Sequence, residues 1–251
     1  MKLHIQNIRK EFLINSGRIT ALTDINLEVR SGEFICFVGP SGCGKSTLLN
    51  LIAGLEQTTS GSVVSKGKIG FMFQEATLFP WLKVKDNVAF GLRVAKRNKD
   101  EISEKVDQYL KLVHLFPFKE AYPHELSGGM KQRVALARAL ILDPDILLMD
   151  EPFAALDAQT REILHGELQE IWQTTKKTII FVTHNIREAV CLGTRVLVFT
   201  AQPGRVKKEY RIDLKRPREM SSLEVMMLSN EIYGELKEEI EVVVKRMYPA
   251  I

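Results

Sequence analysis

The 251-residue sequence lacks several features that would place a protein in a class at once. It has no apolar run near the roughly 20 residues needed to cross a bilayer, so the chain by itself is no channel. Its three cysteines stand at no metal-ligand spacing and form no even-numbered set, which is typical of a reducing cytosol. Its net charge of +4 is too small and too mixed to predict nucleic-acid binding. The first residues, "MKLHIQNIRKEF", lack the apolar stretch of a signal peptide, and we expect none.

What is present is typical of a globular protein with one large domain or a domain with a small appendage: 45% of residues are hydrophobic and 26% are charged. Near the N-terminus, "KLHIQNI" and "LTDINLEV" place apolar residues at every second position, which predicts antiparallel strands with one solvated face. Three later runs, "FICFVG", "DILLMD" and "TIIFVT", are short and almost continuously apolar. Such runs favour strands of a mostly parallel sheet that is covered on both faces.

The predicted fold is therefore α/β, with a mostly parallel sheet core, a small antiparallel β lobe and an inserted helical lobe over about 78–139. We expect a main domain over 1–215 and a C-terminal helical extension over 216–251. Apolar residues of that extension recur at the spacing of an amphipathic helix packed on the domain. They are Ile232, Leu236, Ile240, Val243, Val244 and Met247.

The stretch "GPSGCGKST", residues 39–47, fits the phosphate-loop pattern G-x-x-x-x-G-K-[ST] between a predicted strand and a predicted helix. Its glycines let backbone amides turn toward a phosphate, and the helix start adds partial positive charge. We expect Lys45 to reach the β- and γ-phosphates of a nucleotide and Ser46 to ligate Mg²⁺. The alternative is a glycine-rich turn that binds nothing. The candidate ATP-binding residues of the loop are Gly39, Pro40, Ser41, Gly42, Cys43, Gly44, Lys45, Ser46 and Thr47.

Four polar residues follow other apolar runs and are expected at the same sheet edge, because ligands of open α/β sheets sit at the carboxyl ends of the strands. Asp150 is placed to hold Mg²⁺ and Glu151 to polarise the attacking water. His184 is a candidate for a γ-phosphate contact, and the amide of Gln74 for Mg²⁺ coordination and water orientation. Each of these has an ordinary alternative, such as a solvated turn, a helix cap or an exposed histidine.

The octapeptide "LSGGMKQR", residues 126–133, sets a serine and two glycines at the start of an apparent helix. A plain helix start would use Ser127 as N-cap and leave Gln132 on a solvated face. That interpretation does not explain two glycines where helix formers are preferred.

In its order of motifs the sequence resembles the ATP-binding cassette family over about residues 1–210, and "LSGGMKQR" is similar to that family's signature. The resemblance implies a P-loop ATPase that uses ATP and Mg²⁺ and forms a homodimer in the ATP-bound state. It implies that Phe12 stacks on adenine and that Asp157 lies at the dimer seam. It also implies that one copy holds the γ-phosphate bound on the other with Ser127, Gly128 and Gly129.

One phosphate loop, one signature and no heptad tract favour a subunit that docks under separate transmembrane permease subunits, at the cytoplasmic face of the cell membrane. The resemblance places the docking surface near Phe79 and Trp81, with a solute-binding protein as an indirect partner. "LFPW", "PGR" and "RPR" are similar to the nitrate, sulfonate and taurine importer branch. Two alternatives stay open. The first is a soluble ATPase switch acting on a protein or nucleic-acid complex, and the second is a small-molecule P-loop kinase.

Overall fold

The computed structural model describes residues 1–15 and 17–247, and it divides into two compact units. One unit consists of Met1–Lys66 and Lys176–Ile251, and the other of Gly67–Thr175. The predicted division at residue 215 is a different one and remains a prediction. Among the described residues, no helix combines the length and the apolar character that a membrane span needs.

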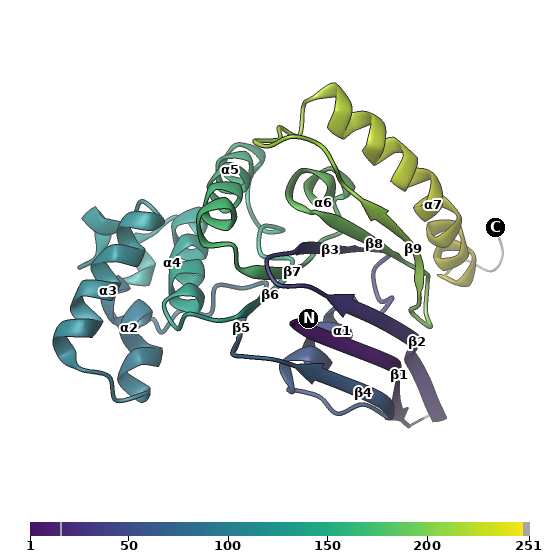
Figure 1. Cartoon of the computed structure of the whole chain (residues 1–251), viewed down its shortest axis with the longest axis horizontal. Helices are drawn as coiled ribbons and strands as arrows, with labels where there is room; N and C mark the ends of the chain where they lie inside the picture. Colours follow the sequence, from purple (N-terminus) through teal and green to yellow (C-terminus); the bar gives the residue numbers. More distant parts are fainter. Residues whose placement is uncertain (16, 248–251) are drawn as a thin grey trace. The chain divides into compact units, whose positions relative to one another are not determined.

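The first unit contains a three-stranded antiparallel sheet in the order β2-β1-β4 (Figure 1). Its strands are β1 (Leu3–Ile14), β2 (Gly17–Val29) and β4 (Ser60–Ser65). On β1 and β2 buried apolar residues alternate with solvated ones, as the two N-terminal stretches predict. The antiparallel β lobe is thus confirmed.

The first unit also contains parallel strands: β3 (Phe34–Val38) pairs with β7 (Thr178–Val182) and with β8 (Arg195–Phe199). Every residue of β3 and β7 is buried. Phe37 pairs with Val182, so the phosphate loop and His184 both start two residues beyond a paired position. Parallel register therefore puts these two candidate site elements at the same sheet edge.

Strand β9 (Val206–Arg211) pairs antiparallel with β8 and was not predicted. Its sequence, VKKEYR, has a weak apolar pattern because only Tyr210 is buried. The helices of this unit are α1 (Lys45–Ala53), α6 (Ile186–Leu192) and α7 (Leu223–Met247).

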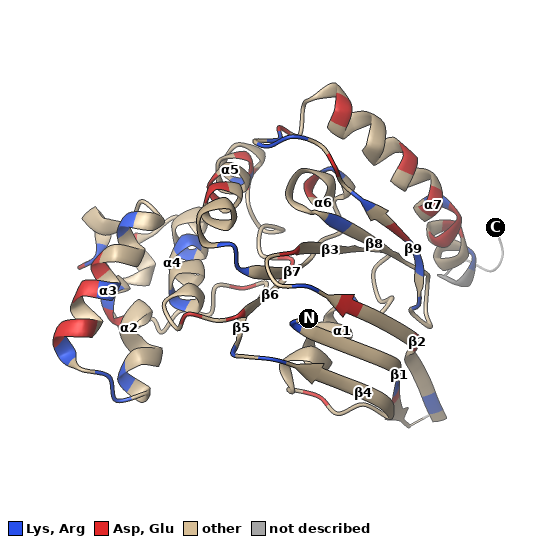
Figure 2. Ribbon diagram, viewed as in Figure 1, with Lys and Arg blue, Asp and Glu red and all other residues tan. Residues whose placement is uncertain are grey.

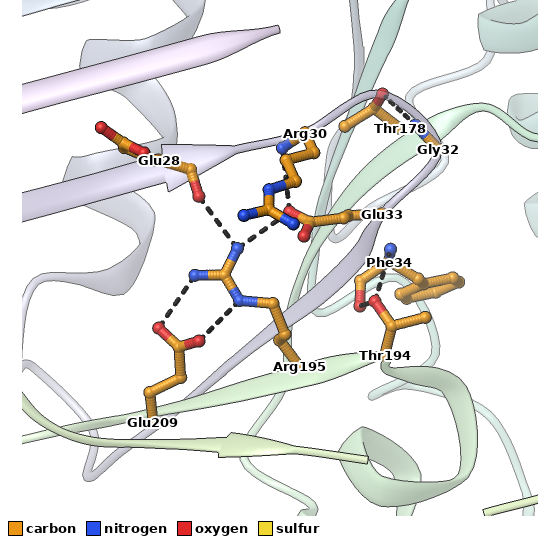
Figure 3. A network of polar contacts seen from close by, with 9 residues as sticks. All are labelled: Glu28, Arg30, Gly32, Glu33, Phe34, Thr178, Thr194, Arg195 and Glu209. Atoms are coloured by element: carbon orange, nitrogen blue, oxygen red, sulfur yellow. Dashed lines mark hydrogen bonds and ion pairs between the residues drawn. The ribbon is translucent and has the colours of Figure 1, made fainter. Parts of the chain in front are cut away.

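The amino-terminal end of β8 carries a polar network (Figure 3). Arg195 donates to both carboxylate oxygens of Glu209 on β9, at 2.7 and 2.8 Å. It also donates to the carboxylate of Glu33 at 2.8 Å and to the carbonyl oxygen of Glu28 on β2 at 2.9 Å. Thr194 both donates to and accepts from the backbone of Phe34. This network ties β2, β8 and β9 together at the edge opposite the phosphate loop.

The second unit contains the parallel pair β5 (Ile69–Met72) and β6 (Ile146–Asp150) with four helices. The helices are α2 (Val84–Val94), α3 (Lys99–Leu112), α4 (Gly128–Leu140) and α5 (Ala158–Thr175), with 3-10 turns at Phe116–Phe118 and Pro123–Glu125. Helices α2 to α4 lie in the stretch predicted to be helical. Met72 pairs with Met149, so Gln74 and Glu151 each lie two residues beyond that pair.

The predicted amphipathic C-terminal helix exists as α7, but it is only partly packed. Ile232 and Leu236 are buried, as expected. Ile240 and Val244 are 39% and 47% exposed, so for them the expectation of packing was wrong. Helical spacing identifies a shared face, but it does not show how far along the helix that face is covered. The side chain of Met247 lies outside the described residues.

Candidate functional site: a nucleotide cradle and a glycine-led helix

The phosphate loop leaves β3 and starts α1 through glycines that accept no side chain. A Cβ on Gly39 would lie 2.9 Å from the Cβ of Phe199, and one on Gly44 would lie 2.6 Å from Leu22 Cδ2. Gly44 also has a φ of +98°, and Gly42 a φ of +76° with open space beside it. The loop therefore packs tightly on the core at Gly39 and Gly44, while its side at Gly42 is open. Helix α1 has no side-chain cap and no acidic residue in its first turn, which suits an anion.

Lys45 lies across this loop rather than in solvent. Its ammonium donates to the carbonyl oxygens of Gly39 at 2.8 Å and Pro40 at 3.0 Å, and the residue is 6% exposed. A phosphate in the loop would compete for the same ammonium. Burial raises the pKa of the neighbouring Cys43 thiol, so this thiol stays protonated near neutral pH. Cys43 can therefore serve the site through its backbone, not as a nucleophile.

A second turn, the "PGR" at 203–205, closely approaches the back of the phosphate loop. Gly204 donates to the carbonyl of Ala21 at 2.9 Å and accepts from Thr23 at 3.0 Å. A Cβ at Gly204 would clash with the backbone carbonyl of Cys43. From the sequence alone, "PGR" is only a motif similar to one importer branch. In the structure this turn packs against the phosphate loop and supports it from behind.

Phe12 lies on β1, opposite Ile19 on β2, in the same unit as the phosphate loop. The ammonium of Lys10 is 4.6 Å from the centre of its ring. Lys10 is fixed in turn by Glu56 at 2.8 Å and the carbonyl of Gln57 at 2.9 Å. One face of a half-buried ring is thus occupied by a cation, and the role of the ring in adenine stacking remains a prediction.

His184 is exposed, and its two neighbours in the chain, Thr183 and Asn185, are both held by hydrogen bonds. Asn185 caps α6 by accepting from the Glu188 amide at 3.3 Å, and its own amide donates to the Thr183 hydroxyl at 3.0 Å. The Thr183 hydroxyl also donates to the buried carboxylate of Glu188. The backbone that carries His184 is therefore held on both sides.

The far end of α6 is held by the "RPR" motif, whose role the sequence did not reveal. Arg218 is 7% exposed and donates to the carbonyls of Val190 at 2.8 Å and Gly193 at 2.6 Å. Arg216 donates to the carbonyl of Leu192. Burial lowers the pKa of Arg216 to about 10, which still leaves it charged at neutral pH. Two cations thus satisfy carbonyls at a helix C-terminus, where positive charge is favoured.

In the second unit, Asp150 ends β6 and Glu151 follows it in a left-handed conformation, with a φ of +44°. A positive φ at a non-glycine residue is uncommon and is often found at functional sites. Gln74 is exposed two residues after β5. Because β5 and β6 are parallel, all three candidate residues lie at one edge of this strand pair.

The signature stretch starts α4, with Ser127 as N-cap accepting from the Met130 amide at 3.3 Å. That part of the plain helix-start interpretation is correct. Its other part is wrong, because Gln132 is 5% exposed and donates to the carbonyl of Gln74 at 2.9 Å. Gly129 is confined as well, since a Cβ there would clash with Thr160. The first turn of α4 contains no acidic residue.

Asp157 caps α5, and its carboxylate accepts from the Thr160 amide at 2.9 Å. This hydrogen bond holds the pKa of Asp157 below its usual value, so the group is ionised at neutral pH. The cap explains an aspartate at this position, whereas its predicted place at a dimer seam stays a prediction.

The aromatic cluster of Phe79, Trp81 and Phe90 lies beyond the Gln74 loop, on the side of α2. The ring centres of Phe79 and Trp81 are 5.7 Å apart and those of Phe79 and Phe90 are 4.6 Å apart. Trp81 is 70% exposed. The fully buried Asn87 accepts from the Phe79 amide at 2.8 Å and donates to the Leu82 carbonyl at 3.0 Å, which fixes this exposed turn.

The oxygen donors predicted for magnesium are of the right kind: a hydroxyl on Ser46, a carboxylate on Asp150 and an amide on Gln74. Magnesium prefers few protein oxygens together with substrate phosphates. Ser46 lies in the first turn of α1 in one unit. In the other unit, Asp150 ends β6 and Gln74 follows β5. The donor set fits Mg²⁺, and its convergence on one ion belongs to the proposal below.

Comparison with known proteins agrees with these features. Residues 22–154 match the model of the family described as ABC transporter. The nitrate import ATP-binding protein of Synechocystis sp. is 46% identical over 85% of this chain and 84% of its own length. The aliphatic sulfonates import ATP-binding protein of Bacillus thuringiensis subsp. konkukian is 42% identical over 92% of this chain and 94% of its own length.

A solved dimeric ATP-binding cassette in a post-hydrolysis state, bound to ADP and Pi, superimposes with a TM-score of 0.75 at 34% identity. It covers 85% of this chain and 100% of its own. The predicted P-loop α/β fold is thereby confirmed. The chain belongs to the ABC transporter family and is one of its ATP-binding, ATP-hydrolysing cassettes.

Proposed function

We propose that this cassette hydrolyses ATP in a head-to-tail pair of copies and so drives import of a small solute through separate transmembrane subunits. The relatives named for nitrate and sulfonate import support the solute class, a small oxyanion or a taurine-like sulfonate. The solved dimeric cassettes support the pairing.

The observation that carries the proposal is that one chain has two glycine-led helix starts, α1 and α4, with no acidic residue in either first turn. Both suit a phosphate, although one nucleotide needs a single phosphate loop. In a head-to-tail pair, α1 of one copy and α4 of the other hold the same γ-phosphate. Ser127 then adds a hydroxyl, and the glycines at 128 and 129 allow close backbone approach.

Each residue has a task in this scheme. The amides of the loop cradle the phosphates, and Lys45 moves its ammonium from the loop carbonyls to the β- and γ-phosphates. Glu151 polarises the attacking water, while His184 and Gln74 contact the γ-phosphate and orient that water. Phe12 stacks on adenine, and Asp157 lies at the seam between the copies. Bound Mg²⁺, held by Ser46, Gln74 and Asp150, would neutralise charge on the phosphates.

Docking of the membrane subunits is assigned to the aromatic cluster. Exposed aromatic residues are enriched at the centres of interfaces, and the turn that bears them is rigid through Asn87. Arg138 on α4 donates to the carbonyls of Ala76 at 2.7 Å and Thr77 at 2.9 Å, next to the bond between Gln132 and Gln74. A displacement of the aromatic cluster by a docked subunit would therefore be transmitted through these hydrogen bonds to α4, the helix that begins at the signature.

This assignment places the cassette at the cytoplasmic face of the cell membrane, with a solute-binding protein as an indirect partner and no nucleic acid involved. A mild-detergent pull-down of the tagged chain from native membranes tests it, with a polytopic membrane protein as the expected partner. Trp81→Ala should lose that partner while the isolated chain keeps its ATPase rate. Phe118→Ala is the matched control, since Phe118 is an exposed aromatic residue outside the cluster.

Recovery of soluble partners alone, with the tagged chain absent from the membrane fraction, would contradict the import function and favour a soluble switch. Transfer of phosphate to an acceptor other than water would contradict the ATPase mechanism itself.

A further inference from the structure

A groove of about 850 Å³ lies between α7 and the sheet edge that carries the phosphate loop, entirely within the first unit. One wall is formed by Gly39, Pro40 and Ser41 and by the segment 184–187. Residues 42–47 and Phe12 do not line it. The groove therefore lies beside the nucleotide cradle and shares with the proposed nucleotide site the first residues of the loop and His184.

The other wall is an apolar stripe of α7. It is lined by side chains at helical spacing: Tyr233, Leu236, Ile240, Val243 and Val244. Three of them are substantially exposed, Tyr233 by 52%, Ile240 by 39% and Val244 by 47%. Exposed apolar side chains gathered along one concave wall are characteristic of ligand sites. The body of a ligand here would be apolar.

None of the polar residues that line the groove is acidic. Ser229 is 4% exposed, and its hydroxyl has no hydrogen-bond partner within the described residues. A buried hydroxyl without a partner is destabilising, and a hydrogen bond to a ligand atom would remove that cost. Arg187 is exposed and makes no ion pair in the described part of the chain. No Asp or Glu is among the lining residues. The head group of a ligand would be an anion.

The α7 wall is fixed in place by charge pairs with β9. Figure 2 marks the basic positions of β9 in blue and the acidic positions of α7 in red. Lys207 pairs with Glu238 at 2.8 Å and with Glu239 at 3.1 Å, and Lys208 pairs with Glu235 at 2.8 Å. Glu239 also accepts from the Ala201 amide at 2.8 Å. The groove is therefore preformed, and a ligand would spend little binding energy on ordering it.

We propose that this groove binds a small amphipathic anion, with one sulfonate or carboxylate head and a short aliphatic body, and that its occupancy alters ATP turnover. The body lies along Ile240 and Val244, and the head lies toward Arg187 and Ser229. Because Gly39–Ser41 form part of the wall, an occupant limits movement of the phosphate loop. Binding itself is independent of the proposed transport function, whereas the effect on turnover rests on it.

Titration calorimetry with 1-hexanesulfonate tests the binding. Two smaller probes are titrated for comparison: methanesulfonate, which has the head group alone, and 1-hexanol, which has the aliphatic body without the anionic head. The proposal predicts one saturable site that binds hexanesulfonate at least about tenfold more tightly than either fragment. Ile240→Trp, which fills the groove, and Arg187→Ala, which removes its cation, should each weaken binding about tenfold or more. Val242→Trp is the control, because Val242 is an exposed α7 residue that does not line the groove.

Saturating ADP should leave hexanesulfonate binding in place, because residues 42–47 are not part of the groove. Simple competition with ADP would place the probe in the nucleotide cradle and overturn the proposal. Absence of saturable binding, or equal affinity in Ile240→Trp, would overturn it as well.

Turnover is measured in parallel on wild type, Ile240→Trp and Val242→Trp. Hexanesulfonate should change the ATPase rate of wild type and Val242→Trp but not that of Ile240→Trp. Binding without any rate change would contradict the coupling, while a chain that binds the probe but hydrolyses no ATP would contradict the proposed function instead.

Discussion

The side-chain amide of Gln132 donates a hydrogen bond to the backbone carbonyl of Gln74, with 2.9 Å between the two atoms. Gln132 belongs to the signature stretch, and Gln74 begins the loop that leads to the aromatic cluster. Both residues lie in the second unit. One hydrogen bond therefore joins the proposed phosphate contact of α4 to the proposed water-orienting loop.

Gln132→Leu keeps the size of the side chain but removes this donor. We expect the ATPase rate to fall about tenfold, because the Gln74 loop loses a fixed position, while ATP affinity of the single chain is unchanged, because the cradle is in the other unit. Steady-state kinetics together with nucleotide titration separate the two effects. Gln173→Leu, at an exposed site on α5, is the control. A loss of ATP affinity equal to the loss of rate would contradict this account.

The sequence was sufficient to predict β1, β2, β3, β6 and β7, because alternation and buried apolar runs depend on local pattern. It missed β9, since a solvated edge strand rich in lysine has little apolar signal. It also placed Gln132 on a solvated face in one interpretation, because burial of a polar side chain depends on a partner 58 residues away. The exposed stripe of α7 was missed for a related reason, because what covers a helix face is set by tertiary structure.

The site residues were predicted from motifs, and the structure adds the contacts that hold them. In the sequence, Gly204 and Arg218 were noted only as parts of motifs that resemble one branch of the family. The structure shows what they contact: Gly204 lies against the Cys43 carbonyl, and Arg218 donates to carbonyls at the end of α6. The convergence of Lys45, Asp150 and Ser127 on one nucleotide remains a prediction.

Gly204→Ala should damage the phosphate loop from behind, because the new methyl group would clash with the Cys43 carbonyl. We expect about 1–3 kcal/mol less unfolding free energy and weaker ATP binding. Denaturant unfolding and nucleotide titration measure both. Gly166→Ala is the matched control: its Cβ meets nothing within 4 Å, so the helix should be slightly stabilised. Equal behaviour of the two variants would refute the bracing role of Gly204.

Arg218→Met should lower the unfolding free energy by about 3 kcal/mol, since the carbonyls of Val190 and Gly193 lose charged donors in a buried place. Chemical denaturation measures the change. Arg205→Met serves as control, because Arg205 is exposed and its hydrogen bonds with Thr200 are made by its backbone amide and carbonyl. A change below about 0.5 kcal/mol for Arg218→Met would show that water replaces the arginine.

Acid should weaken the network in Figure 3. Hydrogen bonds from Arg195 hold the pKa of Glu209 below its usual value in the folded chain. Because the folded pKa is depressed, the stabilisation is present above the unfolded pKa of about 4.3 and is lost as pH falls through the lower folded value. Below about pH 4.3, unfolding free energy should therefore fall more steeply in wild type than in Glu209→Gln. Parallel curves for the two proteins would show that this pair contributes nothing.

The central claim is that Ser127 of one copy acts on the nucleotide bound by the other. Glu151→Gln should keep ATP binding and lose turnover by about 100-fold or more, which leaves the closed pair intact. Adding Ser127→Arg places a bulky cation at the start of α4 without touching the cradle of the same chain.

The most direct measurement is sedimentation of Glu151→Gln and of Glu151→Gln/Ser127→Arg in saturating MgATP, with ATP binding to each measured by titration. The account predicts that the single variant sediments at twice the chain mass of 28.5 kDa. The double variant should bind ATP and remain a monomer. A double variant that pairs as well as the single one, or a single variant that stays monomeric with ATP bound, would contradict the shared site.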